Sequence, residues 1–305
     1  MIYFTMLIGL PGSGKSYYAA NFRDKDTTVL SSDDIRQVLL GSEEAQWNNS
    51  LVFNAMNDAT IANLKEGRNV VYDATNLSSK RRMALLDRID REVKNQIVLR
   101  EAFLFTTSYK VCLKRRTKTC SRKVPQEAME RMLKSFEVPY YEEGWDKIVL
   151  CNPNNDYDKY SSASFLEFIE KYKDYDQNNP YHNETLGAHV ETVMKRYREI
   201  YPAGTQVNPI VLQALAFHDI GKPFCRVEGE DGYSHYYDHA NVGAYFYLSS
   251  KHSLFTCRQI LHIAKLIEWH DVNMTEKALK RRRIEKTIYP VELEIIRMCD
   301  KYRKN

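Results

Sequence analysis

Apolar runs alternate with amphipathic stretches along the first half of the chain. Short, nearly continuous apolar runs predict buried strands at residues 2–8, 69–72, 96–105 and 147–150. Between them, apolar residues recur at helical spacing, as in 57–66 and 79–93. Strands that alternate with helices indicate a parallel sheet with right-handed crossover connections. We therefore predict an α/β domain, a parallel sheet flanked by helices, for residues 1–150.

The pattern changes after residue 150. Two polar, turn-rich segments, CNPNNDYDKYSSAS (151–164) and YDQNNPYHN (175–183), flank a short predicted helix at 165–172. From residue 184 onward, apolar residues recur every three or four positions almost to the end, as at Val207, Ile210, Val211 and Leu215. We predict a linker at 151–180 and an all-helical domain at 181–305.

Composition narrows the class of protein. The chain has 305 residues, enough for about two domains, and its 43% hydrophobic and 28% charged residues are typical of globular proteins. The net charge of +4 permits a nucleic-acid partner without requiring one. Six dispersed cysteines without a C-x-x-C pair favour free thiols in a reducing compartment. With no basic leader and no long apolar segment, we expect a cytoplasmic protein that does not enter a membrane.

The segment GLPGSGKS follows the first predicted strand and fits the pattern G-x-x-x-x-G-K-[ST]. Such glycines let backbone N–H groups surround phosphate oxygens, while the lysine reaches the β- and γ-phosphates and the serine binds Mg²⁺. The sequence therefore predicts a site for ATP or another nucleoside triphosphate with Mg²⁺. Its residues are Gly9, Gly12, Ser13, Gly14, Lys15 and Ser16.

The segment LSSDDIRQ (30–37) admits two interpretations. A carboxylate at the end of a strand can accept the proton of an attacking hydroxyl, and a nearby arginine can bind an acceptor phosphate. However, Ser-Asp before an apolar helix is also ordinary N-capping chemistry, which the spacing alone favours.

The order of GLPGSGKS, SSDDIRQ, YDATNLSSKRR and CLKRRTKTCSRKVPQEAMERM resembles the kinase domain of phage 5′-hydroxyl polynucleotide kinase over residues 1–150. The resemblance implies that Asp33 is the general base and that Arg36 contacts the acceptor phosphate. It also implies that Asp73, Thr75 and Asn76 line the acceptor site. Each segment alone is a weak signal, but the four in this order are specific.

One position departs from that family. Its helical lid carries an arginine on the transferred phosphoryl group, four residues after a Lys-Arg pair, and here that position is Thr119. The basic residues nearby are Arg116, Lys118, Arg122 and Lys123. We expect Arg122 to replace the missing arginine. The alternative is that these residues form only a solvated basic face, in which case phosphoryl transfer should be slow.

The second half carries histidines and aspartates that suit a metal. Each of the following lies on its own predicted helical segment, and a helical bundle can bring such segments together: His189, His218-Asp219, His239, His270 and Asp300. From composition alone, any one of these histidines is more simply an ordinary core or surface residue. Imidazole and carboxylate ligands together suit Mn²⁺, Fe²⁺, Co²⁺, Ni²⁺ or Zn²⁺.

The ordered set H…HD…H…H…D, with HDIGKP and DHANVGA, resembles the HD phosphohydrolase superfamily over residues 180–305. The resemblance implies that His189, His218, Asp219 and Asp300 bind one metal and that His239 and His270 bind a second. It places Lys222 at the substrate phosphate. His182 is expected to be a further phosphate contact, although it is equally well an ordinary loop residue.

Together the two resemblances imply a bifunctional end-healing enzyme. A 5′-hydroxyl kinase would phosphorylate one end of RNA, and a metal-dependent phosphatase or phosphodiesterase would remove a 2′,3′-cyclic, 2′- or 3′-phosphate from the other. The expected partners are RNA or DNA ends, with a separate RNA ligase acting afterwards. Two alternatives stay open: a small-molecule or nucleoside kinase fused to an HD nucleotidase or cyclic-nucleotide phosphodiesterase, and a nucleotide-gated binding module without activity.

Overall fold

The computed structural model describes residues 1–21, 26–45, 47–119, 123–152, 155, 170–180, 184–202 and 204–301. The chain forms two compact units. The first comprises Met1–Met129 and Pro139–Asn155, and the second comprises Glu130–Val138 and Asp156–Asn305. The predicted helix at 165–172 lies mostly outside the described residues.

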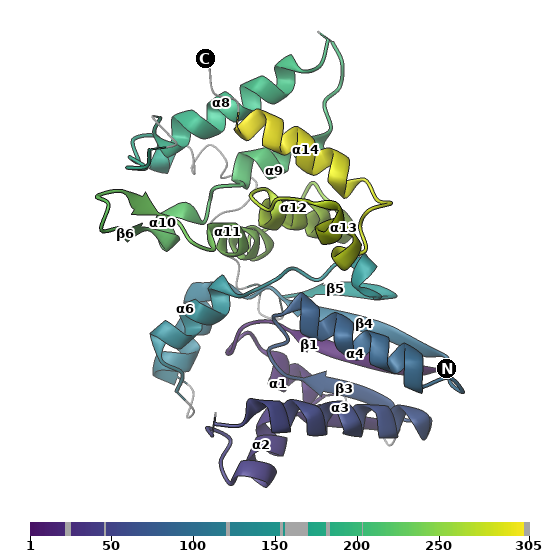
Figure 1. The fold of residues 1–305 in the computed structure, drawn as a ribbon. Helices are drawn as coiled ribbons and strands as arrows, with labels where there is room; N and C mark the ends of the chain where they lie inside the picture. Colours follow the sequence, from purple (N-terminus) through teal and green to yellow (C-terminus); the bar gives the residue numbers. More distant parts are fainter. Residues whose placement is uncertain are drawn as a thin grey trace. The chain divides into compact units, whose positions relative to one another are not determined.

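A five-stranded parallel sheet forms the centre of the first unit (Figure 1). Its strands are β1 (Ile2–Ile8), β2 (Thr27–Ser31), β3 (Asn69–Asp73), β4 (Val98–Phe105) and β5 (Lys147–Cys151). They lie in the order β2-β3-β1-β4-β5, so β1 is central and pairs with β3 and β4. The predicted α/β fold is confirmed. The carboxyl ends of β1, β2 and β3 meet at one edge, which is where parallel sheets bind ligands.

Helices follow the strands as crossover connections. They are α1 (Lys15–Ala19), α2 (Ser32–Leu40), α3 (Asn49–Lys65), α4 (Ser79–Glu92) and α5 (Tyr109–Lys114), which continues into a π-helical turn at Arg115–Thr119. Helices α3 and α4 lie side by side over one face of the sheet (Figure 1). Under α1, the side chains of Leu7, Val71 and Phe105 form a buried cluster with Ala19. This cluster fixes the turn between β1 and α1 against the sheet.

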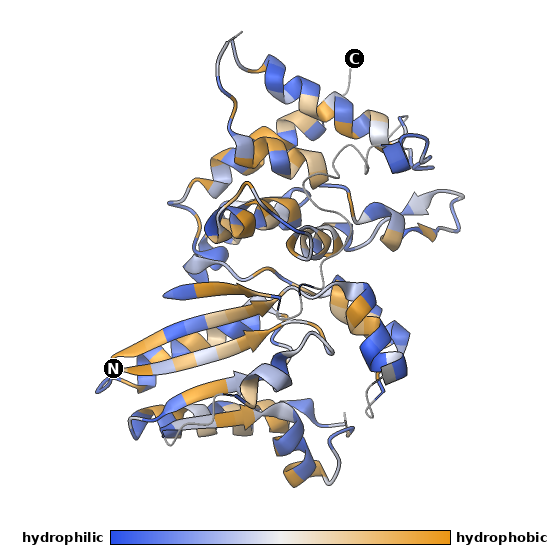
Figure 2. Ribbon diagram, turned by 180° about the vertical axis from the view of Figure 1, so that it is seen from behind, coloured by the Kyte–Doolittle hydropathy of each residue, from blue (hydrophilic) through white to orange (hydrophobic). Residues whose placement is uncertain are grey.

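The second unit is mostly helical, as predicted. Its helices are α8 (Leu186–Glu199), α9 (Pro209–Phe217), α10 (Lys222–Cys225), α11 (His239–Leu248), α12 (Cys257–Trp269), α13 (Glu276–Arg282) and α14 (Tyr289–Asp300). A small hairpin pairs β6 (Val227–Glu228) with β7 (Ser234–His235). Helices α9, α11 and α12 are largely hydrophobic in Figure 2 and form the core of the unit. Among the described helices, none is both long and apolar enough to cross a membrane.

The second unit also includes a segment from the first half of the chain. This segment is Glu130–Val138, and it begins inside helix α6 (Gln126–Lys134). The Phe136 ring packs edge-on against Tyr245, with 5.1 Å between ring centroids. Both backbone groups of Val138 bond to α12, because its carbonyl accepts from Lys265 Nζ (2.6 Å) and its N–H donates to Glu268 Oε2 (2.5 Å). We call this arrangement the Val138 clamp.

Candidate functional site

The turn after β1 forms a phosphate-binding loop. Gly12 and Gly14 have φ of 83° and 106°, in the left-handed region that favours glycine. Lys15 is buried and folds back over the loop, where its Nζ donates to the carbonyls of Gly9 and Leu10, both at 2.9 Å. Burial lowers the pKa of Lys15 to about 8, although Asp73 and other groups nearby oppose this shift. Ser13 is also buried, and its carbonyl accepts from Thr107 Oγ1 at 2.9 Å.

Asp33 and Arg36 lie together at the carboxyl end of β2. Ser31 is the N-cap of α2, and its hydroxyl accepts from the N–H groups of Asp33 and Asp34. Capping is therefore the role of Ser31, and the Asp33 carboxylate instead accepts from Arg36 Nη1 at 2.8 Å. The Arg36 side chain is buried, and its Nη2 donates to Asn49 at 3.1 Å. This bond holds a carboxylate and a guanidinium together at the carboxyl end of β2, which β3 separates from the P-loop strand β1.

The predicted acceptor residues follow β3. The pKa of Asp73 is raised by burial, and Asp33 and Asp34 raise it further, whereas Lys15 and a hydrogen bond from Ser16 lower it. Asp73 therefore lies against the Lys-Ser pair of the P-loop. The Thr75 carbonyl accepts from Gly9 N–H at 3.0 Å, and Asn76 donates to the Leu7 carbonyl at 2.7 Å. These two bonds fasten the loop after β3 to the P-loop strand.

A buried ion pair also stabilises the loop after β3. Arg82 meets Glu143 in a two-bonded fork, with Nη2–Oε1 at 2.6 Å and Nε–Oε2 at 2.8 Å. Its remaining nitrogen donates to the carbonyls of Asn76 and Leu77. The planar guanidinium satisfies four acceptors at once, a geometry that lysine cannot reproduce.

The π-helical turn brings two arginines to the P-loop. Arg115 Nη1 donates to the Gly12 carbonyl at 3.0 Å. A Cβ placed on Gly12 would lie 3.2 Å from Arg116 Cγ, so the Arg116 stem packs on this glycine. The Arg116 Nε atom is buried without a hydrogen-bond partner among the described residues. Arg122, which the sequence analysis favoured as the lid arginine, lies outside the described residues, and the pattern alone did not distinguish Arg116 from it.

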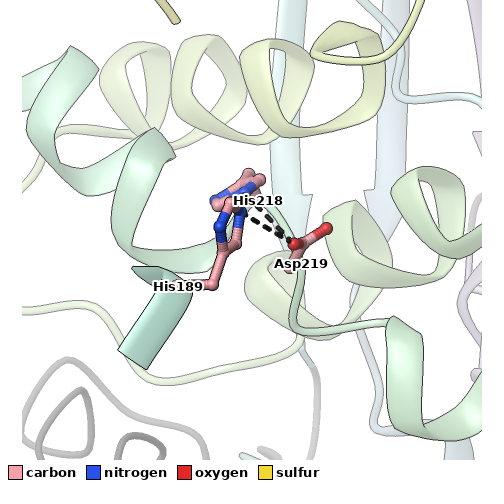
Figure 3. Close-up of side chains that lie close together, drawn as sticks. All are labelled: His189, His218 and Asp219. Atoms are coloured by element: carbon pink, nitrogen blue, oxygen red, sulfur yellow. Dashed lines mark hydrogen bonds and ion pairs between the residues drawn. The ribbon is translucent and has the colours of Figure 1, made fainter. Parts of the chain in front are cut away.

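In the second unit, the six predicted ligands converge on one buried point. His189 lies in α8, His218 caps the end of α9 and Asp219 follows it. His239 begins α11, His270 caps the end of α12, and Asp300 ends α14. Figure 3 shows His189, His218 and Asp219, with both imidazoles directed toward the carboxylate.

Asp219 lies between two groups of ligand atoms. Its Oδ2 is 3.2 Å from His218 Nε2 and 3.6 Å from His189 Nε2. Its Oδ1 is 3.2 Å from His239 Nε2 and 3.8 Å from His270 Nε2. Within each group, the two histidine Nε2 atoms are 3.3 Å apart. Each trio can therefore hold one cation, and the carboxylate would be shared between them.

Three of the histidines are oriented by their own backbone. The Nδ1 atoms of His218, His239 and His270 lie 2.7–2.8 Å from the carbonyls three residues earlier. A carbonyl accepts only, so Nδ1 carries a proton and, in the neutral ring, the lone pair is on Nε2. In each group, two Nε2 lone pairs and a carboxylate oxygen lie close together. These atoms repel one another unless a cation or a proton lies between them. The donor set thus fits divalent transition metals.

The helix ends and the electrostatics favour a cation as well. The carboxyl ends of α9, α12 and α14, which carry partial negative charge, all reach the cluster. Burial would lower the pKa of His218, but Asp219 and Asp300 raise it well above its usual range. Burial would likewise raise the pKa of Asp219, but His218 and Lys222 hold it well below its usual range. The carboxylates therefore stay ionised inside the unit.

Two residues that the sequence analysis did not assign border this cluster. Gln177 Oε1 accepts from Lys222 Nζ at 2.9 Å, and the same Nζ lies 2.7 Å from Asp219 Oδ2. Asp271 Oδ2 lies 3.3 Å from His239 Nε2. A signal for Asp271 was present in the chain, because it repeats the His-Asp pairing of His218 and Asp219. His182 lies outside the described residues.

Comparison with known proteins bears on the first unit. Residues 4–139 match a family model described as an AAA domain. The first unit is a P-loop, kinase-like domain. The match covers under half of the chain and, of the helical unit, includes only the segment Glu130–Val138. No curated protein matches the chain.

Solved structures with some similarity include two assemblies. One is described as the Pnkp1/Rnl/Hen1 RNA repair complex, with 22% identity, a TM-score of 0.38 and coverage of 53% of each chain. The other is described as a Pnkp1/Rnl/Hen1 complex, with 19% identity, a TM-score of 0.32 and coverage of 65% of this chain and 66% of that one. The chain thus spans about half to two thirds of these chains, and similarity this low carries no functional argument.

Proposed function

We propose that this protein heals nucleic-acid ends, with RNA or DNA ends as the substrate. The P-loop unit phosphorylates 5′-hydroxyl ends with ATP, and the helical unit removes a 2′,3′-cyclic, 2′- or 3′-phosphate. The observation that supports this most is the convergence of His189, His218, Asp219, His239, His270 and Asp300 in one buried cluster. A separate RNA ligase would join the 5′-phosphate and 3′-hydroxyl ends that result.

In the kinase unit, Asp33 is the proposed general base. It takes the proton of the 5′-hydroxyl, whose oxygen then bonds to the γ-phosphorus of ATP as the bond to the β-phosphate oxygen breaks and ADP leaves. Arg36, whose Nη1 donates to Asp33 at 2.8 Å, orients this carboxylate and is the proposed contact of the acceptor phosphate. Lys15 and Ser16 bind the ATP phosphates and Mg²⁺. Arg116, which packs on Gly12, is a second candidate beside Arg122 for the arginine that position 119 lacks.

In the helical unit, the six residues would hold divalent metal ions. Such ions would polarise a phosphoryl oxygen and lower the pKa of a water molecule. Asp219 presents one oxygen to each ligand group, which sets the two groups side by side. Lys222 fixes the Asp219 carboxylate and holds a positive charge where a substrate phosphate oxygen would bind.

The test uses an RNA oligonucleotide with a 5′-hydroxyl and a 2′,3′-cyclic phosphate, incubated with ATP, Mg²⁺ and a panel of transition metals. Mass spectrometry follows both ends. We expect gain of a 5′-phosphate and loss of the 3′-end phosphate. Asp33→Asn should abolish only the first change and Asp219→Ala only the second, so each variant serves as the control for the other.

The outcomes separate the alternatives. Phosphorylation of nucleosides but not of oligonucleotides would replace end healing with a small-molecule kinase. A 5′ gain without any 3′ change, under every metal, would refute the proposed phosphatase and point to a different phosphoester. Retained phosphorylation in Asp33→Asn would remove Asp33 from the role of general base.

A further inference from the structure

We infer that Asp271 is the terminal ligand of the second metal position, and that it completes a four-ligand set that matches the first. The inference rests on the proposed metal site, and it concerns a residue that neither the sequence motif nor the resemblance assigned. Asp271 directly follows His270, in the turn after α12.

The first ligand group shows what such a set looks like. Its members are two histidines, the Oδ2 atom of Asp219, and Asp300 as a carboxylate from a separate helix end. Asp300 Oδ1 lies 3.0 Å from His189 Nε2 and 3.6 Å from His218 Nε2. Two atoms that bind one metal at about 2.1 Å are about 3.0–3.4 Å apart. The 3.0 Å separation falls in this range and the 3.6 Å separation lies slightly beyond it, so these atoms border a space that one cation could occupy.

Asp271 repeats this geometry around the second group. Its Oδ2 lies 3.3 Å from His239 Nε2 and 3.6 Å from His270 Nε2. The histidines contribute the same 3.3 Å pair, and Asp219 Oδ1 takes the place of Oδ2. The two groups thus have equal composition: two imidazoles, one oxygen of Asp219, and one further carboxylate.

The ion pairs of Asp271 indicate no other structural role for this side chain. Within the described part of the chain, its ion-pair partners are only His239 and His270. Its side chain is about half exposed, whereas the Asp300 side chain is 10% exposed. The second ligand group is therefore more open to solvent at its terminal carboxylate than the first.

The experiment compares metal binding by Asp271→Asn, Asp300→Asn and the wild-type chain. Asparagine keeps the shape of the side chain and removes its charge. Each protein is stripped of metal and titrated with Mn²⁺, and bound ions per chain are counted by mass spectrometry. Electron paramagnetic resonance then reports whether the ions form a coupled pair. The matched control is Glu276→Gln, which removes an exposed carboxylate from the neighbouring helix α13.

We expect the wild type and Glu276→Gln to bind two ions as a coupled pair. Asp271→Asn should bind one ion tightly, with the affinity for the second lowered by more than about 100-fold and the coupled signal lost. Asp300→Asn should lose the other ion. An Asp271→Asn protein that keeps two ions with unchanged affinity would overturn the inference, as would a wild type that binds fewer than two.

Failure of the proposed function is a separate result. A wild type that binds two coupled ions but removes no phosphate from any RNA end would refute the phosphatase, while the metal count of Asp271→Asn would still decide the ligand role. Asp271 is partly exposed, so its substitution should leave the fold intact. Unchanged circular dichroism of the variant checks this point.

Discussion

The Val138 clamp allows one stability prediction to be worked out from the structure. Lys265 and Glu268 are buried, at 0% and 4% exposed, and their charges pair at 2.8 Å. Lys265→Met keeps the apolar length of the side chain but leaves the Glu268 carboxylate without its cation and the Val138 carbonyl without its donor. Removal of one partner from a buried pair costs about 3–5 kcal/mol. We expect the free energy of unfolding of the second unit to fall by this amount.

Hydrogen exchange measured by mass spectrometry is the suitable assay, because peptides from α12 report on the second unit alone. A loss of about 3–5 kcal/mol corresponds to exchange about 10²–10⁴-fold faster for the most protected amides. The loss should also depend on pH. Burial already raises the pKa of Glu268, and without Lys265 the pKa rises further. The variant can then protonate Glu268, so its penalty shrinks as the pH falls and grows as it rises.

The same substitution on the surface is the control. Lys280 pairs with Glu276 at 2.6 Å on α13, but their side chains are 63% and 80% exposed. Because exposed pairs contribute little, Lys280→Met should change the stability by no more than about 0.5 kcal/mol. Equal effects of the two variants would refute the reasoning, since burial would then not decide the cost.

Three further predictions concern the sites. In the protein without ATP, the pKa of Lys15 is about 8, and bound phosphates favour the charged lysine. ATP binding near pH 8 should therefore take up protons, and the affinity for ATP should fall about tenfold for each pH unit above 8. Calorimetry in two buffers can measure both effects. Gly221→Ala would place a Cβ 2.1 Å from the His239 carbonyl oxygen, so it should destabilise the second unit by about 3 kcal/mol or more and lose metal, seen in thermal unfolding and ion counts. Arg116→Ala should slow 5′-phosphorylation at least about 10³-fold in a single-turnover assay, whereas a comparable loss in exposed Lys118→Ala would remove Arg116 from this role.

The fold was largely predictable, and the exception has a physical cause. Strands β1 and β3 form apolar runs because neighbouring strands and helices cover them. Strand β2 has no fully buried residue, and its sequence TTVLS lacks such a run. The sequence analysis placed a strand end before Asp33 but set no limits for it.

The candidate metal cluster was predictable only in part. Spacing along the chain could not show that His189 and Asp300, 111 positions apart, lie 3.0 Å from each other. The ordered motif identified the six residues, and the structure brings all six together. The motif did not assign Asp271, because a His-Asp pair along the chain does not show that the aspartate lies beside a ligand group. Its proximity to His239 depends on how α11 packs on α12, which is a tertiary property.

The Val138 clamp has a consequence for how the chain can be divided. Helix α12 carries Lys265 and Glu268, which bond to the Val138 backbone, and it ends at His270. The segment that contains Val138 therefore also stabilises the helix that positions His270. That segment, residues 130–138, lies well before the boundary that the sequence pattern suggests at residue 150. A chain cut at 150 would leave α12 with two buried charges and no Val138 backbone between them, and it would uncover the Tyr245 ring that Phe136 covers. The cut would remove both hydrogen bonds to Val138, each worth about 0.5–1.5 kcal/mol net, and the Phe136 contact, so residues 151–305 alone should be less stable than the same helices in the whole chain. The two candidate activities are therefore best separated by point substitutions at Asp33 and Asp219, which leave the segment in place.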